Sequence, residues 1–297
     1  MMATGRPNSR MFALPKPPPT ALRLCGQEYR LARVFKHDFW AATCLYVADS
    51  PASPQPDAFE KVAVKFGREQ DFCGLPLAWV GEFLADREQA IYQALAGVEG
   101  VPRWAGRLGP STYAIEYIDA RPLDHLQAPP QGFFDSLRGL LEAIHARGVA
   151  YGDANKRSNI LVGDRGRPYL VDFQLAIRRR DELPWPIGAA LRKVVAYLAA
   201  KDIYHLCKHK RRLCPQELTG EEEKLSRRRT GLHLLHRKLT KPYRAIRRRF
   251  LTAQYQKGRL VSPTADLEDH YMPEKATWQF ERKPEAQRGH RDEGDGS

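Results

Sequence analysis

Two stretches decide the fold of this chain, HARGVAYGDANKRSNILV at residues 145–162 and PYLVDFQ at residues 168–174. The first places Asp153 and Asn159 just before a short apolar run, and the second is an apolar run that ends at Asp172. Short apolar runs bounded by turn residues are typical of buried strands. Two carboxylates and one amide are therefore expected on a loop and at two strand ends.

This residue set suits phosphoryl transfer, which needs a carboxylate beside the attacking hydroxyl and oxygen ligands for magnesium. Its spacing resembles the catalytic loop and the metal-binding segment of the protein-kinase-like superfamily. The resemblance implies that Asp153 is the catalytic base and that Asn159 and Asp172 hold Mg²⁺. The alternatives are a turn aspartate at Asp153 and solvated strand ends at the other two positions.

Further charged residues fit the same resemblance. Lys156 lies inside the loop, where its ammonium would meet the transferred phosphate, and a solvated lysine is the competing interpretation. Lys65 ends the sequence V-A-V-K, which is close to the V-A-I-K strand signature, so a phosphate contact is favoured over an edge-strand lysine. Its acidic partner is expected on the next helix. Glu88 is favoured there over Glu82 and Glu69, because it shares the buried stripe.

Nucleotide contacts are expected at two more places. Residues Glu116 to Ile118 should form the hinge between two lobes, where backbone groups would hydrogen-bond adenine. The loop at residues 35–41 contains no glycine. Its backbone therefore cannot approach phosphates closely, and Lys36 or His37 is expected to substitute for it.

One expected helix carries two groups of polar side chains. Asp202 resembles the large-lobe aspartate that braces the catalytic loop, and an ordinary helix-surface aspartate is the alternative. His205, Cys207, His209 and Cys214 are residue types that bind zinc. Metal binding is not favoured, because Cys207 points away from the histidine pair on a helix and lysines and arginines surround the group.

The whole pattern predicts an α+β, two-lobed protein-kinase-like fold. The first half is predicted to contain five strands, at residues 29–35, 41–48, 62–66, 104–108 and 112–118, and one helix at 77–96 that buries Val80, Leu84, Ile91 and Leu95. The second half is predicted to be mainly helical, at residues 133–147, 187–213, 219–240 and 243–257. The domains are a disordered tail (1–20), a small lobe (21–118), a large lobe with basic helices (119–262) and a disordered polar tail (263–297).

The positive charge is concentrated in one region. The chain of 297 residues has a formal net charge of +13, and residues 201–260 hold 18 Lys and Arg against 5 Asp and Glu. Such a surface favours anionic partners. The five cysteines are scattered, and no apolar run approaches the ~18 residues of a membrane span. We therefore expect a reduced, cytoplasmic setting.

Several features resemble the bacterial lipopolysaccharide-core sugar kinases (Kdo and heptose kinases) more than protein kinases. Tyr151-Gly152-Asp153 stands where protein kinases have His-Arg-Asp. The stretch REQAIYQAL at residues 87–95, followed by Gly100-Val101-Pro102, resembles that family's helix and exit turn. Only 13 residues separate Phe173 from the helix expected near Ile187, and they contain no Ala-Pro-Glu. This short segment leaves little platform for a peptide substrate.

The resemblance implies a kinase that uses ATP and Mg²⁺ to phosphorylate a hydroxyl, and the acceptor it implies is a sugar of a lipopolysaccharide-type glycolipid. The expected partners are a nucleotide, an anionic glycolipid or phosphorylated saccharide, and, through residues 201–260, the acidic inner face of the cytoplasmic membrane. Nucleic acid is not favoured. A Ser/Thr protein kinase, similar to RIO kinases, and a pseudokinase scaffold remain as alternatives. Gln174, where kinases have glycine after Asp-Phe, and the glycine-free loop favour the scaffold, whereas the intact trio opposes it.

Overall fold

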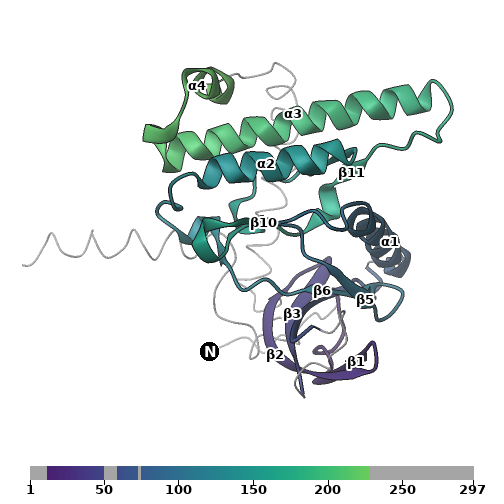
Figure 1. Cartoon of the computed structure of the whole chain (residues 1–297). Coiled ribbons are helices and arrows are strands. Elements are labelled where there is room, and N and C mark those ends of the chain that lie inside the picture. Colours follow the sequence, from purple (N-terminus) through teal and green to yellow (C-terminus); the bar gives the residue numbers. More distant parts are fainter. Residues whose placement is uncertain (1–11, 50–58, 73–74, 228–297) are drawn as a thin grey trace, which may run out of the picture.

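The fold is mixed α/β, with a curled antiparallel sheet in the first half of the chain and mainly helices in the second (Figure 1). The computed structural model describes residues 12–49, 59–72 and 75–227. The sheet has the strand order β1-β2-β3-β4-β6-β5. Its strands are β1 (Ala21–Leu24), β2 (Gln27–His37), β3 (Ala41–Ala48), β4 (Lys61–Gly67), β5 (Trp104–Arg107) and β6 (Thr112–Glu116). Helix α1 (Ala78–Ala94) connects β4 to β5.

The sheet contains one strand more than the five expected, because β1 forms a hairpin with β2. Cys25 and Gly26 lie between the paired residues Leu24 and Gln27, and their φ angles are 49° and 83°. Positive φ at both central residues is typical of a type I′ turn, whose twist suits paired strands. The dipeptide Cys25-Gly26 could therefore have indicated the hairpin that contains β1, although the usual dipeptides of such turns are Asn-Gly and Asp-Gly.

Strand β4 separates core residues from residues that face α1. Val62, Val64 and Phe66 are buried in a core that also contains Tyr29 and Tyr46. Side chains alternate between the two faces of a strand, so Lys65 projects from the opposite face. The alternation in V-A-V-K-F therefore delivers one lysine toward the helix.

The second half begins with two small sheets that support the loops between them. The three-stranded sheet has the order β10-β9-β7, and the two-stranded sheet pairs β11 with β8. These strands are β7 (Arg121–Pro122), β8 (Val149–Ala150), β9 (Ile160–Val162), β10 (Pro168–Leu170) and β11 (Ile177–Arg178). The helices are α2 (Phe133–Ala146), α3 (Ile187–Leu213) and α4 (Gly220–Arg227). Short 3-10 turns are η2 (Leu123–His125), η3 (Arg157–Asn159), η4 (Asp164–Gly166), η5 (Phe173–Leu175) and η6 (Pro215–Glu217).

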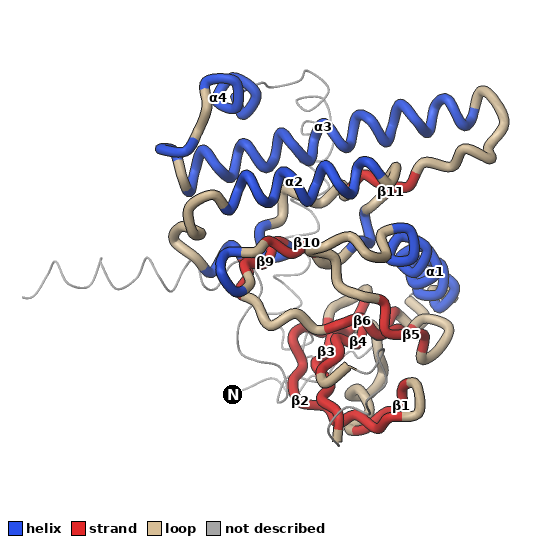
Figure 2. The backbone as a smooth tube through the Cα atoms, in the orientation of Figure 1, coloured by secondary structure: helices blue, strands red, loops and turns tan. Residues whose placement is uncertain are grey.

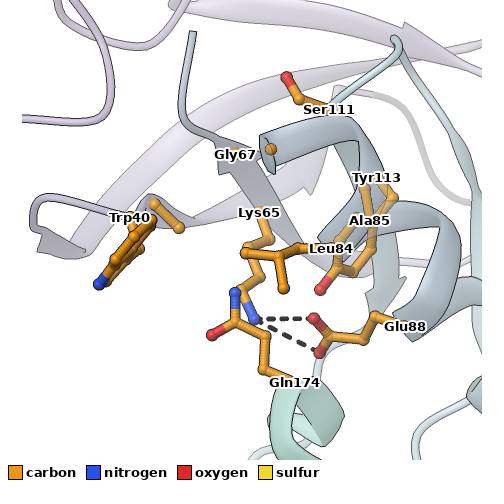
Figure 3. Close-up of a pocket in the computed structure, with 11 residues that line it drawn as sticks. Trp40, Lys65, Gly67, Leu84, Ala85, Glu88, Ser111, Tyr113 and Gln174 are labelled. Carbon is orange, nitrogen blue, oxygen red and sulfur yellow. Dashed lines mark hydrogen bonds and ion pairs between the residues drawn. The ribbon is translucent and has the colours of Figure 1, made fainter. Parts of the chain in front are cut away.

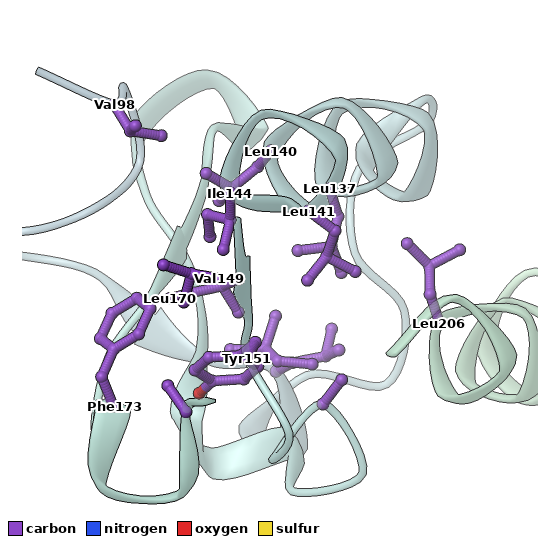
Figure 4. Close-up of a cluster of buried hydrophobic side chains, with 14 of the residues drawn as sticks. Val98, Leu137, Leu140, Leu141, Ile144, Val149, Tyr151, Leu170, Phe173 and Leu206 are labelled. Carbon is purple, nitrogen blue, oxygen red and sulfur yellow. The ribbon is translucent and has the colours of Figure 1, made fainter. Parts of the chain in front are cut away.

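Helix α2 supplies one side of the larger core (Figure 4). Leu137, Leu141 and Ile144 recur at helical spacing and are buried. They belong to one cluster with Val149 and Phe173, which flank the loop that carries Asp153. Burial of each such side chain contributes about 1.5–3 kcal/mol, so this cluster holds the loop in place.

The buried face of α1 differs from the expected stripe. Gly81, Ala85, Glu88, Ile91 and Tyr92 are its buried residues. Val80 and Leu84, which were expected on that face, are only half-buried. A charged side chain therefore occupies the centre of the face, where apolar periodicity assumes a hydrophobic one.

Several of the remaining expected elements lie partly or wholly outside the described residues. Helix α3 has the expected bounds, whereas the helix expected at 219–240 is described only as α4. The helix expected at 243–257, the tail expected at 263–297 and the first residues of the N-terminal tail lie outside the described residues. Figure 2 shows α2, α3 and α4 together, apart from the sheet that α1 covers. Within the described part of the chain, no helix has the length and apolar character needed to cross a membrane.

Candidate active site

A partly buried ion-pair network joins the sheet, α1 and the Asp-Phe-Gln segment, and Figure 3 shows its Lys65–Glu88 pair. Lys65 Nζ lies 3.0 Å from Glu88 Oε2 and 2.9 Å from Asp172 Oδ1. Glu88 Oε1 also accepts a hydrogen bond from the Phe173 backbone N–H at 3.1 Å. Arg87 donates to the Ala176 carbonyl at 2.8 Å. Helix α1 is thus fastened to both the strand and the segment that carries Asp172.

The network keeps its charges through mutual compensation. Burial alone would lower the pKa of Lys65, but the charges of Glu88 and Asp172 outweigh burial and raise it. Burial raises the pKa of Glu88, and Lys65 opposes that shift. Burial would also raise the pKa of Asp172, but Lys65, together with Lys156 and Lys36, lowers it. Asp172 is therefore an anion at neutral pH with three cations in its surroundings.

Hydrogen bonds join Asp153, Asn159 and the segment before Asp172. Asn159 Nδ2 donates to Asp153 Oδ2 at 2.9 Å. The backbone N–H of Val171 donates to the Asn159 carbonyl at 3.1 Å, and the Tyr151 hydroxyl donates to the Val171 carbonyl at 2.6 Å. These bonds tie the Asp153 loop to the residue before Asp172. The base candidate and both metal-ligand candidates thus belong to one hydrogen-bonded unit.

Two backbone positions in this unit need unusual conformations. Gly152 has φ 76°, and a Cβ there would lie 2.9 Å from the Leu175 carbonyl oxygen, so only glycine fits. Asp172 has φ 60° and ψ 75°, in the left-handed region. Aspartate tolerates this region better than most residues, at a cost of order 1–3 kcal/mol. The surrounding bonds hold the carboxylate in a direction that an extended strand would not give it.

Asp202 braces the backbone of the loop that carries Asp153, which was one of the two alternatives. It is buried on α3 and accepts hydrogen bonds from the backbone N–H groups of Tyr151 and Gly152, both at 2.9 Å. His145 Nε2 lies 3.2 Å from the same carboxylate. One carboxylate therefore satisfies two backbone donors next to the base candidate.

Replacing Asp202 with asparagine should lower turnover and stability together. An amide has only one oxygen, so one buried N–H loses its acceptor, at a cost of about 1–3 kcal/mol. We expect kcat to fall at least tenfold with little change in KM for ATP, measured by steady-state kinetics. Asp181→Asn changes an exposed aspartate before the same helix and serves as the control. Equal kcat in the two variants would contradict the bracing role.

Helix α3 also supplies contacts that sequence reasoning missed. His209 Nε2 lies 3.0 Å from the Ala154 carbonyl, and Lys208 Nζ donates to Asn155 Oδ1 at 3.1 Å. The histidine was weighed only as a zinc ligand, because its spacing to a loop 55 residues away cannot be read locally. Burial lowers the pKa of His209 to about 4, against the opposing hydrogen bond to Ala154. His209 is therefore neutral at pH 7, with Nε2–H donating to the loop.

The neutral state of His209 should make the fold sensitive to mild acid. The unfolded chain protonates this histidine below pH about 6.5, whereas the folded chain resists protonation until about pH 4, so stability is lost as pH falls through that window. We expect His209 to account for about 2 kcal/mol of loss between pH 7 and pH 5. Urea unfolding of His209→Gln at both pH values should show that component missing. An unchanged pH dependence in the variant would refute the assignment.

The glycine-free loop between β2 and β3 is a tight turn whose backbone is hydrogen-bonded to two side chains. Asp38 Oδ1 accepts hydrogen bonds from the N–H groups of Trp40 and Ala41, at 2.8 and 3.0 Å. The fully buried Arg68 donates to the Phe39 carbonyl at 2.8 Å, and its guanidinium lies 3.9 Å from the Phe39 ring centroid. Arg68 carried no sequence signal. Side-chain hydrogen bonds thus fix the conformation of this turn, whereas a glycine-rich loop depends on the backbone flexibility of glycine.

Lys36 and His37, which were expected to contact phosphate in place of the loop backbone, differ in their surroundings. His37 is buried and lies 3.1 Å from the Leu14 backbone nitrogen, which donates to its Nε2. It therefore faces the core, and its expected phosphate contact is wrong. Lys36 forms an ion pair with Asp38 and contributes to the low pKa of Asp172. Of the two, Lys36 is the cation that acts on the site.

A pocket lies between the turn, β4 and α1 (Figure 3). Trp40, Lys65, Glu88 and Gln174 are among the residues that line it, with Lys65 between Trp40 and Glu88 in the view of Figure 3. The expected hinge residues lie at the end of β6 and beyond. Glu116 bonds through its backbone N–H to the Arg103 carbonyl at 2.8 Å, and Ile118 follows in irregular structure. The Glu116 side chain pairs with Arg103, so its role in adenine binding stays a prediction for the backbone.

The chain is similar to a known protein in structure, whereas the comparisons of its sequence found no match. Among solved structures, the chain is similar to the Rio2 kinase from Chaetomium thermophilum, with 13% sequence identity and a TM-score of 0.47. The match covers 66% of this chain and 63% of that chain, so this chain spans less than two thirds of the length of that kinase. No protein-family model and no curated protein matches the sequence.

Proposed function

We propose that the protein is an ATP-dependent phosphotransferase that phosphorylates an alcohol group. The observation that carries the proposal is the convergence of two units: Lys65 paired with Glu88 and Asp172, and Asp153 bonded to Asn159. The first unit suits the phosphates of a nucleotide and the second suits an acceptor hydroxyl. The two units are joined next to Asp172, where the Val171 backbone N–H donates to the Asn159 carbonyl.

In this mechanism the acceptor hydroxyl binds next to Asp153. The carboxylate accepts the hydroxyl proton, the hydroxyl oxygen attacks the γ-phosphorus, and the bond to the β-γ bridging oxygen breaks, which releases ADP. Lys65 holds the phosphates of the donor, and Lys156 offers a positive charge to the transferred group. Positioning and charge stabilisation supply most of the rate enhancement in such reactions.

The residues present also fit a magnesium ion. Asp172 offers a carboxylate and Asn159 an amide oxygen, the hard ligands that Mg²⁺ takes together with water and phosphate oxygens. The Nδ2 of Asn159 is engaged with Asp153, which directs the amide oxygen elsewhere. When bound, the ion would neutralise charge on the phosphates during transfer.

The Asp172→Asn variant tests the metal role. Asparagine can still accept the Lys65 hydrogen bond, so the fold should persist while one negative ligand is lost. We expect ATP with Mg²⁺ to raise the melting temperature of the wild type more than ATP alone does. In Asp172→Asn, ATP with Mg²⁺ and ATP alone should raise the melting temperature by the same amount. A full magnesium-dependent increment in the variant would exclude Asp172 as a ligand.

For the acceptor, we propose a sugar hydroxyl of a lipopolysaccharide-type glycolipid. The segment between Phe173 and α3 is short and pairs through β11 with β8, which leaves little surface for a peptide. The N-terminal half of α3 extends beyond α2 (Figure 1), and it exposes Ile187, Val194 and Tyr197, after Trp185 at 83% exposure. Exposed aromatic and aliphatic side chains of this kind favour a membrane interface. The basic segment expected to contact the membrane lies mostly outside the described residues.

The test is transfer of label from γ-³²P-ATP and Mg²⁺ in the presence of purified bacterial lipopolysaccharide and a general protein substrate such as casein. The proposal expects label in the lipopolysaccharide fraction and none with Asp153→Ala. Label in casein alone would favour the Ser/Thr protein kinase. If wild type and Asp153→Ala both fail to turn over ATP with either acceptor, the chain is a scaffold and the proposal is wrong.

A further inference from the structure

A group of cations lies beside the catalytic loop, on the side contacted by α3. Lys208 reaches the loop at Asn155, two residues after Asp153, with Nζ and Oδ1 3.1 Å apart. Arg157 belongs to the loop itself, in η3. Arg212 follows Lys208 by four residues on α3, so the two side chains share a face of the helix. The cluster is defined here as Arg157, Lys208 and Arg212.

The charges of all three cluster residues act on His209. Burial lowers the pKa of His209, and the charges of all three cluster residues lower it further. Burial likewise lowers the pKa of Lys208, with Arg212 and Arg211 adding to the effect. The His209 ring contacts the Ala154 carbonyl at 3.0 Å, so the group on which these charges act lies next to the base candidate.

The cluster differs from the neighbouring Lys210 in having no acidic partner among the described residues. Lys210, on the same helix, pairs with Asp135 at 2.8 Å and with Glu222 at 3.0 Å. Arg211 donates to the Ser226 hydroxyl at 3.0 Å. In contrast, no carboxylate of residues 12–49, 59–72 and 75–227 forms an ion pair with a cluster residue. Arg157 and Lys208 are partly buried and Arg212 is exposed. Like charges that lie close together repel one another, and a bound anion would relieve that repulsion.

We infer that Arg157, Lys208 and Arg212 bind an anionic group of the acceptor, a phosphate or a carboxylate on the sugar unit next to the hydroxyl that is phosphorylated. The inference rests on the proposed function and specifies its substrate class. Two residues of chain span at most about 7 Å, so an anion at Lys208 lies within roughly one sugar unit of Asp153. Arginine and lysine together are suited to phosphate and carboxylate oxygens.

The first experiment measures anion binding without catalysis. Wild type, Lys208→Gln/Arg212→Gln and the control Arg192→Gln/Lys193→Gln are saturated with a non-hydrolysable ATP analogue and Mg²⁺, and glucose 6-phosphate is titrated against glucose by NMR. Both variants lose two positive charges of α3, and glutamine at position 208 can still bond to Asn155. We expect saturable binding of glucose 6-phosphate, weakened at least tenfold in the cluster variant only, and no binding of glucose.

A stability measurement separates a ligand site from a structural role. Without added anion, Arg212→Gln should melt at the same temperature as the wild type or higher, because it removes like-charge repulsion. With 20 mM inorganic phosphate, the wild type should gain more than Arg212→Gln. A lower melting temperature of Arg212→Gln without phosphate would assign the arginine a structural role and overturn the inference. Arg212→Gln also replaces the double variant in the titration if the latter fails to fold.

Kinetics with lipopolysaccharide complete the test. The cluster variant should raise KM for the acceptor at least tenfold and leave KM for ATP unchanged. Equal binding of glucose 6-phosphate in the cluster and control variants would overturn the inference even if the protein is a kinase. Binding of anionic vesicles or single-stranded RNA that needs the cluster, without binding of glucose 6-phosphate, would overturn it as well. Cluster-dependent binding of glucose 6-phosphate without any turnover would support the site and reject the proposed function.

Discussion

Replacing Asp153 with alanine is expected to reduce phosphoryl transfer by about 10³-fold, the largest kinetic effect in this chain. The carboxylate is the only candidate base bonded to Asn159, and without it the acceptor hydroxyl has no proton acceptor in position. Nucleotide affinity should change less than about threefold, because Lys65 and Asp172 are untouched. Single-turnover transfer to acceptor and fluorescence titration with a nucleotide analogue measure the two quantities.

The matched control is Asp164→Ala, which removes an exposed aspartate from the turn between β9 and β10. It should retain wild-type transfer. Asp153→Asn should behave like Asp153→Ala, since an amide accepts no proton at neutral pH. Transfer at the wild-type rate in Asp153→Ala would falsify the assignment of the base.

Lys65→Met should produce the largest loss of stability together with a loss of activity. Methionine has a similar shape but no charge, so Glu88, which is 2% exposed, would be left as an uncompensated buried carboxylate facing Asp172. Breaking a buried pair by removing one partner costs about 3–5 kcal/mol. Urea unfolding should show this decrease in the free energy of unfolding, and ATP turnover should be lost.

A double variant separates the two consequences. Lys65→Met/Glu88→Gln removes both members of the pair, and it should recover most of the lost stability without recovering turnover. Lys61→Met, on the same strand, removes a lysine whose ion pair with Asp119 is exposed, and it should cost less than about 1 kcal/mol. If the double variant is no more stable than Lys65→Met, the two side chains are not energetically coupled.

Much of the site followed from spacing along the chain. Asp153, Asn159 and Asp172 flank short apolar runs, and Lys65 alternates with buried valines in β4. Local periodicity placed these residues at strand ends and on one strand face, and the resemblance to the kinase-like motifs selected them as site residues. Glu88 was chosen over Glu82 and Glu69 by its helical phase, and the ion pair with Lys65 agrees with that choice. The apolar stripe of α1 was less well predicted, because the pair draws a carboxylate into the buried face.

Contacts between distant segments could not be predicted in this way. The resemblance offered loop bracing as one of two roles for Asp202, and only the structure shows the two loop N–H groups that it accepts from. Nothing in the local sequence indicated that His209 would contact Ala154 or that Arg68 would anchor the turn at Phe39. The same limit explains His37, which was expected to contact phosphate but bonds to Leu14 in the core.

By itself, the sequence determined which residue types sit at strand ends, loops and helix faces, because side-chain periodicities of two and 3.6 residues are local properties of the backbone. Only the tertiary structure decided which of those residues meet. Hydrogen bonds and ion pairs act over about 3 Å, and the separations that bring Lys65 to Asp172 or Asp202 to Tyr151 depend on how whole elements pack.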